Sequence, residues 1–87
     1  MQIQFQSIEV GSRLEQWKVT HTATVKATRE GQDVHEIAEG DSQIDAFRNA
    51  LEKLGINWNS IPAGYRANQG SSWDTTVRVV EYLKTQS

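Results

Sequence analysis

The chain has 87 residues, of which nine are basic and eleven acidic, and it contains no cysteine. A domain usually comprises about 100–150 residues, so the length accommodates one domain, residues 1–87, and excludes a self-contained barrel enzyme. The net charge of -2 is not that of a nucleic-acid-binding protein. Without cysteine the chain has no disulfide framework and no thiol nucleophile.

Residues 1–17 lack the basic start and the unbroken apolar run of a secretory signal. No stretch of the sequence approaches the ~20 apolar residues that are needed to cross a membrane. We therefore expect a cytoplasmic protein that makes no contact with a membrane.

Alternating apolar and polar residues predict three strands in the first half of the chain. Over residues 3–10 the alternation changes phase, which predicts a strand with a bulge near Gln6 and Ser7, ended by a turn at Gly11. Over residues 17–28 the apolar side chains occupy odd positions, as in a strand with one buried and one wet face. A turn at Gly31 then leads into an antiparallel strand over residues 34–39, with position 26 opposite 35 and position 21 opposite 40.

The next segment carries the signals of a helix start and a helix end. Ser42 is a suitable N-cap, with Asp45 three residues later as in a capping box. Gly55 is a natural residue to follow the last turn of the helix. The apolar stripe of this helix consists of Ile44, Phe47, Leu51 and Leu54.

The last third of the sequence predicts two further strands, over residues 56–61 and about 73–83, followed by a frayed tail. The predicted order is therefore β-β-β-α-β-β. This order defines an α+β fold with one mostly antiparallel sheet and a single helix packed on one face. We expect the uncovered face of the sheet to be polar or to meet a partner chain.

Few residues offer chemistry. His21 and His35 lie on different strands and have no metal-ligand spacing, so we expect a partly buried His21, an exposed His35 and no metal. The segment around Ser71 lacks the second glycine of a nucleophile elbow. The carboxylates show no sign of a pair held in a cleft. We therefore predict a protein that is not an enzyme, with no catalytic residue and no cofactor.

Two local features are candidates for binding. Trp17 and Trp73 fall on apolar faces of predicted strands, where they would pack in the core or at a subunit interface. The predicted helix start at residues 40–45 presents free N–H groups that suit an anion or a carboxylate. The alternative is that Ser42 and Asp45 satisfy these N–H groups themselves.

Residues 23–26, the turn at Gly31 and residues 38–51 resemble the C-terminal regulatory domain of 2-isopropylmalate synthase and of relatives such as citramalate synthase. In the motif of that family, Gly40 matches the first glycine and Ile44, Asp45 and Ala46 match its valine, aspartate and alanine. Two positions depart, because Ser42 and Gln43 replace the second glycine and the proline. The resemblance covers residues 17–55 and continues weakly over residues 65–79.

The resemblance implies an allosteric and dimerisation module that binds leucine or isoleucine between two βββα halves at a subunit interface. This chain would supply one half, so two or more chains would complete the effector site, and we expect a homodimer. The implied ligand-binding residues are Gly40, Asp41, Ser42, Gln43, Ile44, Asp45, Ala46 and Phe47. The alternative is a protein-interaction adaptor of the same fold that has lost its effector site.

Overall fold

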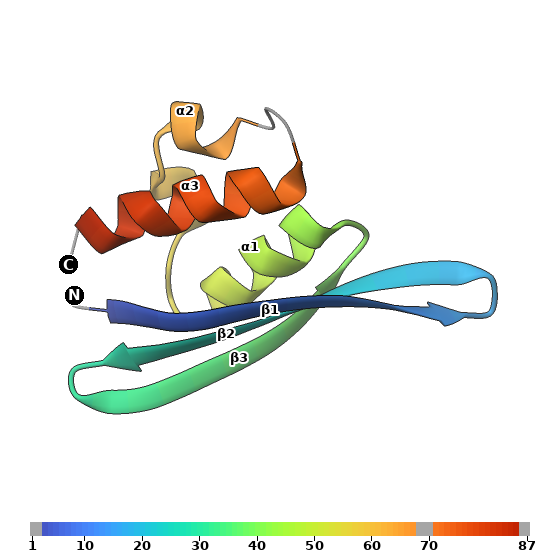
Figure 1. The fold of residues 1–87 in the computed structure, drawn as a ribbon, viewed down its shortest axis with the longest axis horizontal. Helices are drawn as coiled ribbons and strands as arrows, with labels where there is room; N and C mark the ends of the chain where they lie inside the picture. The colour runs from blue at the N-terminus through green and yellow to red at the C-terminus, as the bar shows by residue number, and fades with distance from the viewer. Residues whose placement is uncertain (1–2, 68–70, 86–87) are drawn as a thin grey trace.

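The computed structural model describes residues 3–67 and 71–85, with one antiparallel sheet and the helices gathered on one face of it (Figure 1). The sheet has the order β1-β2-β3, and its strands are β1 (Ile3–Glu15), β2 (Lys18–Arg29) and β3 (Gln32–Gly40). The helices are α1 (Gln43–Lys53), the 3-10 helix η1 (Trp58–Ser60), α2 (Ala63–Arg66) and α3 (Ser72–Thr85). The α+β class predicted from the sequence is therefore confirmed.

The two strands predicted in the last third are wrong, and so is the order β-β-β-α-β-β with its single helix. Residues 58–60 form η1, and the segment predicted as the last strand is the helix α3. Ser71 and Asp74 cap α3 reciprocally: the Asp74 N–H donates to Ser71 Oγ at 3.1 Å, and the Ser71 N–H donates to Asp74 Oδ2 at 3.2 Å. The helix buries Thr76, Val79 and Leu83, whose spacing of three and four residues defines one helical face.

The first hairpin is longer than predicted. The predicted bulge is confirmed, because the register between β1 and β2 shifts between Phe5 and Ser7. The predicted turn at Gly11 is wrong, since β1 continues to Glu15 and Gly11 lies opposite Thr22 within the sheet. The turn is formed instead by residues 16 and 17, which join β1 to β2.

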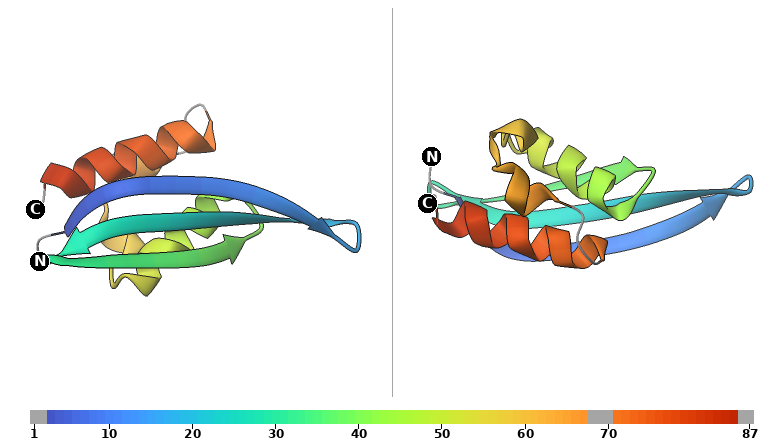
Figure 2. Two further views of the ribbon diagram at one scale, coloured as in Figure 1. Left: turned by 60° about the horizontal axis from the view of Figure 1, so that its bottom comes forward. Right: turned by 90° about the horizontal axis from the view of Figure 1, so that it is seen from above.

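The second hairpin has the predicted register, with Lys26 opposite His35 and His21 opposite Gly40. The pair of His21 with Gly40 is also the last pair of β2 with β3. Beyond it, β1 and β2 continue as a two-stranded ribbon, residues 13–20, which we call the hairpin arm. Figure 2 shows the arm projecting past the helices, and the molecule is 41 Å long in this direction.

The core lies between one face of the sheet and α1. Phe47 and Leu51 on α1 are fully buried, as the predicted apolar stripe requires, and α1 packs against β2 and β3. On β2 the core face consists of Ala23, Val25 and Ala27, all buried. The Trp58 ring meets the Phe47 ring edge-on, with ring centroids 6.1 Å apart.

The point where the sheet ends depends on a glycine. A Cβ atom at Gly40 would lie 2.6 Å from the backbone nitrogen of Ala46 and 2.8 Å from the Asp45 side chain. Only glycine allows β3 to approach the start of α1 this closely. The chain therefore leaves the sheet at Gly40, and β3 does not extend along the hairpin arm.

Replacement of Gly40 by alanine should lower the free energy of unfolding by about 1–3 kcal/mol, because the added methyl group overlaps backbone atoms. Chemical denaturation followed by circular dichroism measures this change. The matched control is Gly64→Ala in α2, where a Cβ meets no atom within 4 Å. Equal stability of the two variants would contradict the steric argument.

Candidate functional site

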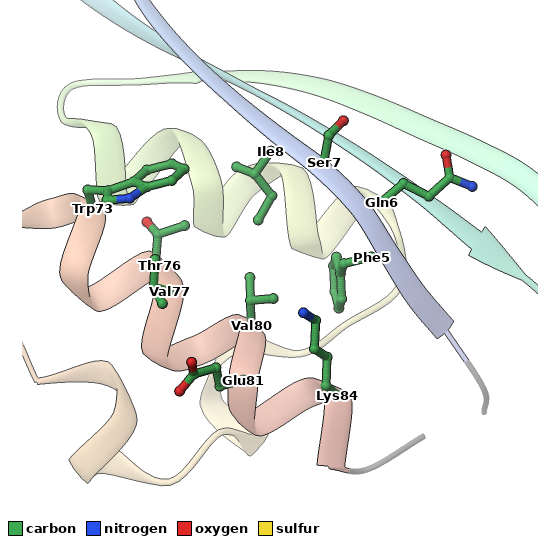
Figure 3. A pocket seen from close by; sticks show the side chains of 10 residues that line it. All are labelled: Phe5, Gln6, Ser7, Ile8, Trp73, Thr76, Val77, Val80, Glu81 and Lys84. Atoms are coloured by element: carbon green, nitrogen blue, oxygen red, sulfur yellow. The ribbon is translucent and has the colours of Figure 1, made fainter.

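A groove of about 250 Å³ lies between the first half of β1 and α3 (Figure 3). We call it the β1–α3 groove. Its lining residues are Phe5, Gln6, Ser7, Ile8, Trp73, Thr76, Val77, Val80, Glu81 and Lys84. Typical small-molecule pockets have volumes of about 300–1,000 Å³, so this groove is smaller than most of them. Its size and mainly apolar wall suit one or two apolar side chains of a polypeptide.

The β-bulge gives the groove its apolar wall. Phe5 and Ile8 lie three positions apart, so in a regular strand their side chains would face opposite sides of the sheet. The extra residue at Gln6 reverses the phase, and Figure 3 shows both apolar side chains projecting from β1 towards α3. The side chain of Gln6 points away from α3, and its amide donates to Asp33 Oδ1 at 3.1 Å.

The hairpin arm carries a group of apolar side chains outside the core. Leu14 on β1 lies opposite Val19 on β2, and both are exposed because the arm extends past the helices. Leu14 is 64% exposed, and Trp17 at the tip is 96% exposed. The arm therefore presents an apolar surface that nothing in the described part of the chain covers.

The turn at the tip of the arm is conformationally unfavourable. Gln16 and Trp17 have φ values of 50° and 65°, the left-handed pair of a type I′ turn. In the second hairpin the same position is filled by Gly31, which adopts its φ of 80° without steric cost. A bulky aromatic residue in this region costs about 1–2 kcal/mol. Strain at an exposed aromatic residue is the kind of observation from which a functional hypothesis starts.

The two edges of the sheet differ. At the β3 edge, side chains of α1 occupy backbone carbonyls: Lys53 Nζ donates to the Ile37 carbonyl at 2.7 Å and Asn49 Nδ2 to the Glu39 carbonyl at 2.9 Å. In the described residues, no helix or loop donates a hydrogen bond to β1 between residues 8 and 14. An edge strand with free backbone groups is a template for pairing with another chain. The β3 edge is thus blunted, while this part of the β1 edge is open.

The residues that the resemblance assigned to an effector, 40–47, lie together at the end of β3 and in the first turn of α1. The helix start satisfies itself: Ser42 Oγ accepts a hydrogen bond from the Asp45 N–H at 3.2 Å. Ala46 and Phe47 are fully buried in the core. This geometry favours the alternative in which the segment is a capped helix start, and none of its residues lines the β1–α3 groove.

The structure places the remaining candidates as follows. The prediction that Trp17 lies on a strand face is wrong, because Trp17 lies in the turn of the hairpin arm. Trp73 lies in the first turn of α3 at the β1–α3 groove and is 45% exposed. His21 is partly buried and His35 exposed, as predicted. Among the described residues, no group of three or more histidine, aspartate or glutamate side chains has the arrangement of a metal site.

Sequence reasoning missed the groove because it missed α3. The motif Ser71-Ser72-Trp73-Asp74 has the spacing of a capping box, which would have indicated a helix start there. The positive φ at Trp17 has no signal in the sequence, because glycine or asparagine normally marks such a turn.

Comparison with known proteins finds no protein-family model, no curated protein and no solved structure that matches the chain. The resemblance to the 2-isopropylmalate synthase regulatory domain therefore stays a prediction. Within the part of the chain that the structure describes, no helix has both the length and the apolar composition needed to cross a membrane.

The role of Ser42 can be tested directly. Ser42→Ala should lower the free energy of unfolding by about 1 kcal/mol, because an N–H group at the start of α1 loses its acceptor. Asp41→Ala is the matched control, since the side chain of Asp41 is 87% exposed and its ion pair with Lys18 is long at 3.8 Å. We expect the control to change stability by less than about 0.5 kcal/mol. An unchanged stability of Ser42→Ala in thermal and urea unfolding would exclude the capping role.

Proposed function

We propose that the chain is a protein-interaction module, in which the hairpin arm and the β1–α3 groove bind another polypeptide. The observation that carries this proposal is Trp17, a 96% exposed tryptophan held at a φ of 65°. The Trp17 side chain packs against almost nothing in the described part of the chain, and its backbone conformation strains the turn. An exposed aromatic side chain with these properties is best explained by contact with a partner, because aromatic residues dominate the energetics of protein interfaces.

Three neighbouring features support the same function. The arm presents apolar side chains, the groove offers an apolar recess, and the β1 edge between residues 8 and 14 has free backbone groups. Together these features fit the addition of a strand to a sheet edge, in which the backbone supplies hydrogen bonds and pockets select side chains. The proposal corresponds to the adaptor alternative of the sequence analysis and involves neither catalysis nor a small-molecule effector.

The proposal predicts opposite effects of one change on stability and on binding. Replacement of Gln16 by asparagine together with Trp17 by glycine creates a favourable two-residue turn, which should raise the free energy of unfolding by about 1–2 kcal/mol. Denaturation in dilute solution, where association is negligible, measures this gain. The same variant should lose partner binding. A variant that is less stable than the parent would contradict the strained-turn argument.

The function itself is tested with three purified, immobilised proteins: the parent, the double variant Leu14→Ser with Trp17→Ser, and Ile37→Ser. The last is the matched control, because Ile37 is an exposed apolar residue of β3 outside the arm and the groove. We expect the parent and the control to bind the same purified partner, which the double variant does not bind. Sedimentation of the parent alone shows whether that partner is the chain itself. If the parent neither self-associates nor binds any protein in an arm-dependent manner, the proposed function is wrong.

A further inference from the structure

We infer that the partner is a second copy of this chain, and that the two copies join their β1 strands in antiparallel fashion about a two-fold axis at Gly11. This inference rests on the proposed function and names the occupant of its site. It follows from the direction of the backbone groups of β1, from the positions of Glu9 and Arg13, and from the relation between the arm and the groove.

The backbone of β1 limits the registers that a second copy can adopt. Glu15 and Lys18 flank a two-residue turn and therefore form a hydrogen-bonded pair. Alternation from this pair turns the backbone groups of Ile8, Val10, Ser12 and Leu14 towards the free edge. In a pairing of β1 with itself, these residues must face one another. The two-fold axis must then pass through a residue. Even-numbered residues of one copy therefore lie opposite even-numbered residues of the other, and odd-numbered residues lie opposite odd-numbered ones.

Among the registers that pair five or more residues of each β1 strand, charge selects one. With the axis at Gly11, Glu9 of each copy lies opposite Arg13 of the other, so that two opposite-charge pairs form. With the axis at Ser12, Glu9 lies opposite Glu15, and with the axis at Glu9 or at Arg13 a charged residue faces itself. With the axis at Val10, no charged residues oppose each other. Opposite charges placed directly across a pair of strands are stabilising and like charges destabilising.

Glu9 is available for this contact, since no ion pair of Glu9 is formed among the described residues. Arg13 already contacts Glu39 and Glu15 in its own chain, with Arg13 Nε 2.7 Å from Glu15 Oε1. A guanidinium group has five N–H donors, so Arg13 can also donate to the carboxylate of Glu9 of the second copy.

The same register brings the arm of each copy to the groove of the other. Leu14 lies opposite Ile8 of the second copy, and Ile8 lines the β1–α3 groove. Trp17 then extends beyond the paired segment, towards Phe5 of the second copy on the same groove. The exposed apolar side chains of the arm are thereby covered. Each copy supplies one arm and one groove, so the contact closes on itself as an isologous dimer.

The pairing is tested first by a disulfide. At the two-fold axis the two Gly11 residues form a non-hydrogen-bonded pair, whose Cα atoms lie ~4.5 Å apart, within the range that a disulfide spans. The chain has no cysteine of its own, so Gly11→Cys introduces the only thiol. We expect Gly11→Cys to form a covalent dimer under mild oxidation. The matched control is Glu15→Cys, whose two copies lie far apart in this register and should stay monomeric on a non-reducing gel.

A second experiment leaves Gly11 unchanged, because a Cβ there lies 3.2 Å from Thr22 Oγ1 and the cysteine variant requires a small adjustment. Glu9→Arg and Arg13→Glu each place like charges opposite each other twice, and each should raise the dimer dissociation constant by about tenfold or more. An equimolar mixture of the two variants restores both opposite-charge pairs as a heterodimer. Sedimentation velocity and native mass spectrometry distinguish the heterodimer from the two homodimers, and circular dichroism confirms that each variant is folded.

The outcomes separate this inference from the proposed function. A parent chain that is monomeric at all concentrations but binds another protein through the arm overturns the inference and leaves the proposed function standing. A dimer in which Glu15→Cys cross-links as fast as Gly11→Cys, or in which the charge variants show no preference for each other, overturns the pairing about Gly11. Cross-linking at Gly11 alone together with the preferred heterodimer supports it.

Discussion

The contact between Gly40 and the start of α1 is the constraint on which the rest of the architecture depends. Because Gly40 has no side chain, the third strand can approach the helix start closely and turn directly into the helix that Ser42 caps. Phe47 and Leu51 of that helix then cover the small residues on the core face of β2. The same turn ends β3 opposite His21, and the ribbon of β1 and β2 beyond this point has no third strand beside it. The close approach at Gly40 thus ends the third strand, and the hairpin arm is the part of the first hairpin that lies beyond this end.

The two hairpins of the sheet differ in how favourable their turns are. The turn at Gly31 uses a residue that adopts positive φ without strain, while the turn at Trp17 places a large aromatic ring in the same conformation. The two edges show a parallel difference. Carbonyl groups of the β3 edge are hydrogen-bonded by Lys53 and Asn49, but the β1 edge next to the arm stays open. The strained turn, the open edge and the β1–α3 groove all lie on the first hairpin or beside it, which is why we propose an interaction site there.

The bulge at Gln6 shows how a small irregularity can create a site. It turns both Phe5 and Ile8 towards α3, so that a single strand supplies the apolar wall of the groove. The change of phase was visible in the sequence and predicted the bulge correctly. The groove that the bulge helps to form has no signal in the sequence, because residues 73–83 are predicted to be a strand. The many β-branched residues of α3 favour a strand by propensity, whereas burial of Thr76, Val79 and Leu83 on one face stabilises the helix.

The sequence by itself determined the first three strands, the β2–β3 register, the Ser42 cap and the apolar stripe of α1, because each follows from side-chain period or from local hydrogen bonding. It did not determine the length of the arm, the exposure of Trp17 or the groove between β1 and α3. These depend on the close approach of Gly40 to Ala46 and on which elements pack over which part of the sheet. Contacts between residues far apart in the chain decide such features, and no local pattern records them. The tertiary structure therefore places the candidate interaction site on the first hairpin and α3 and leaves the start of α1 as a capped helix.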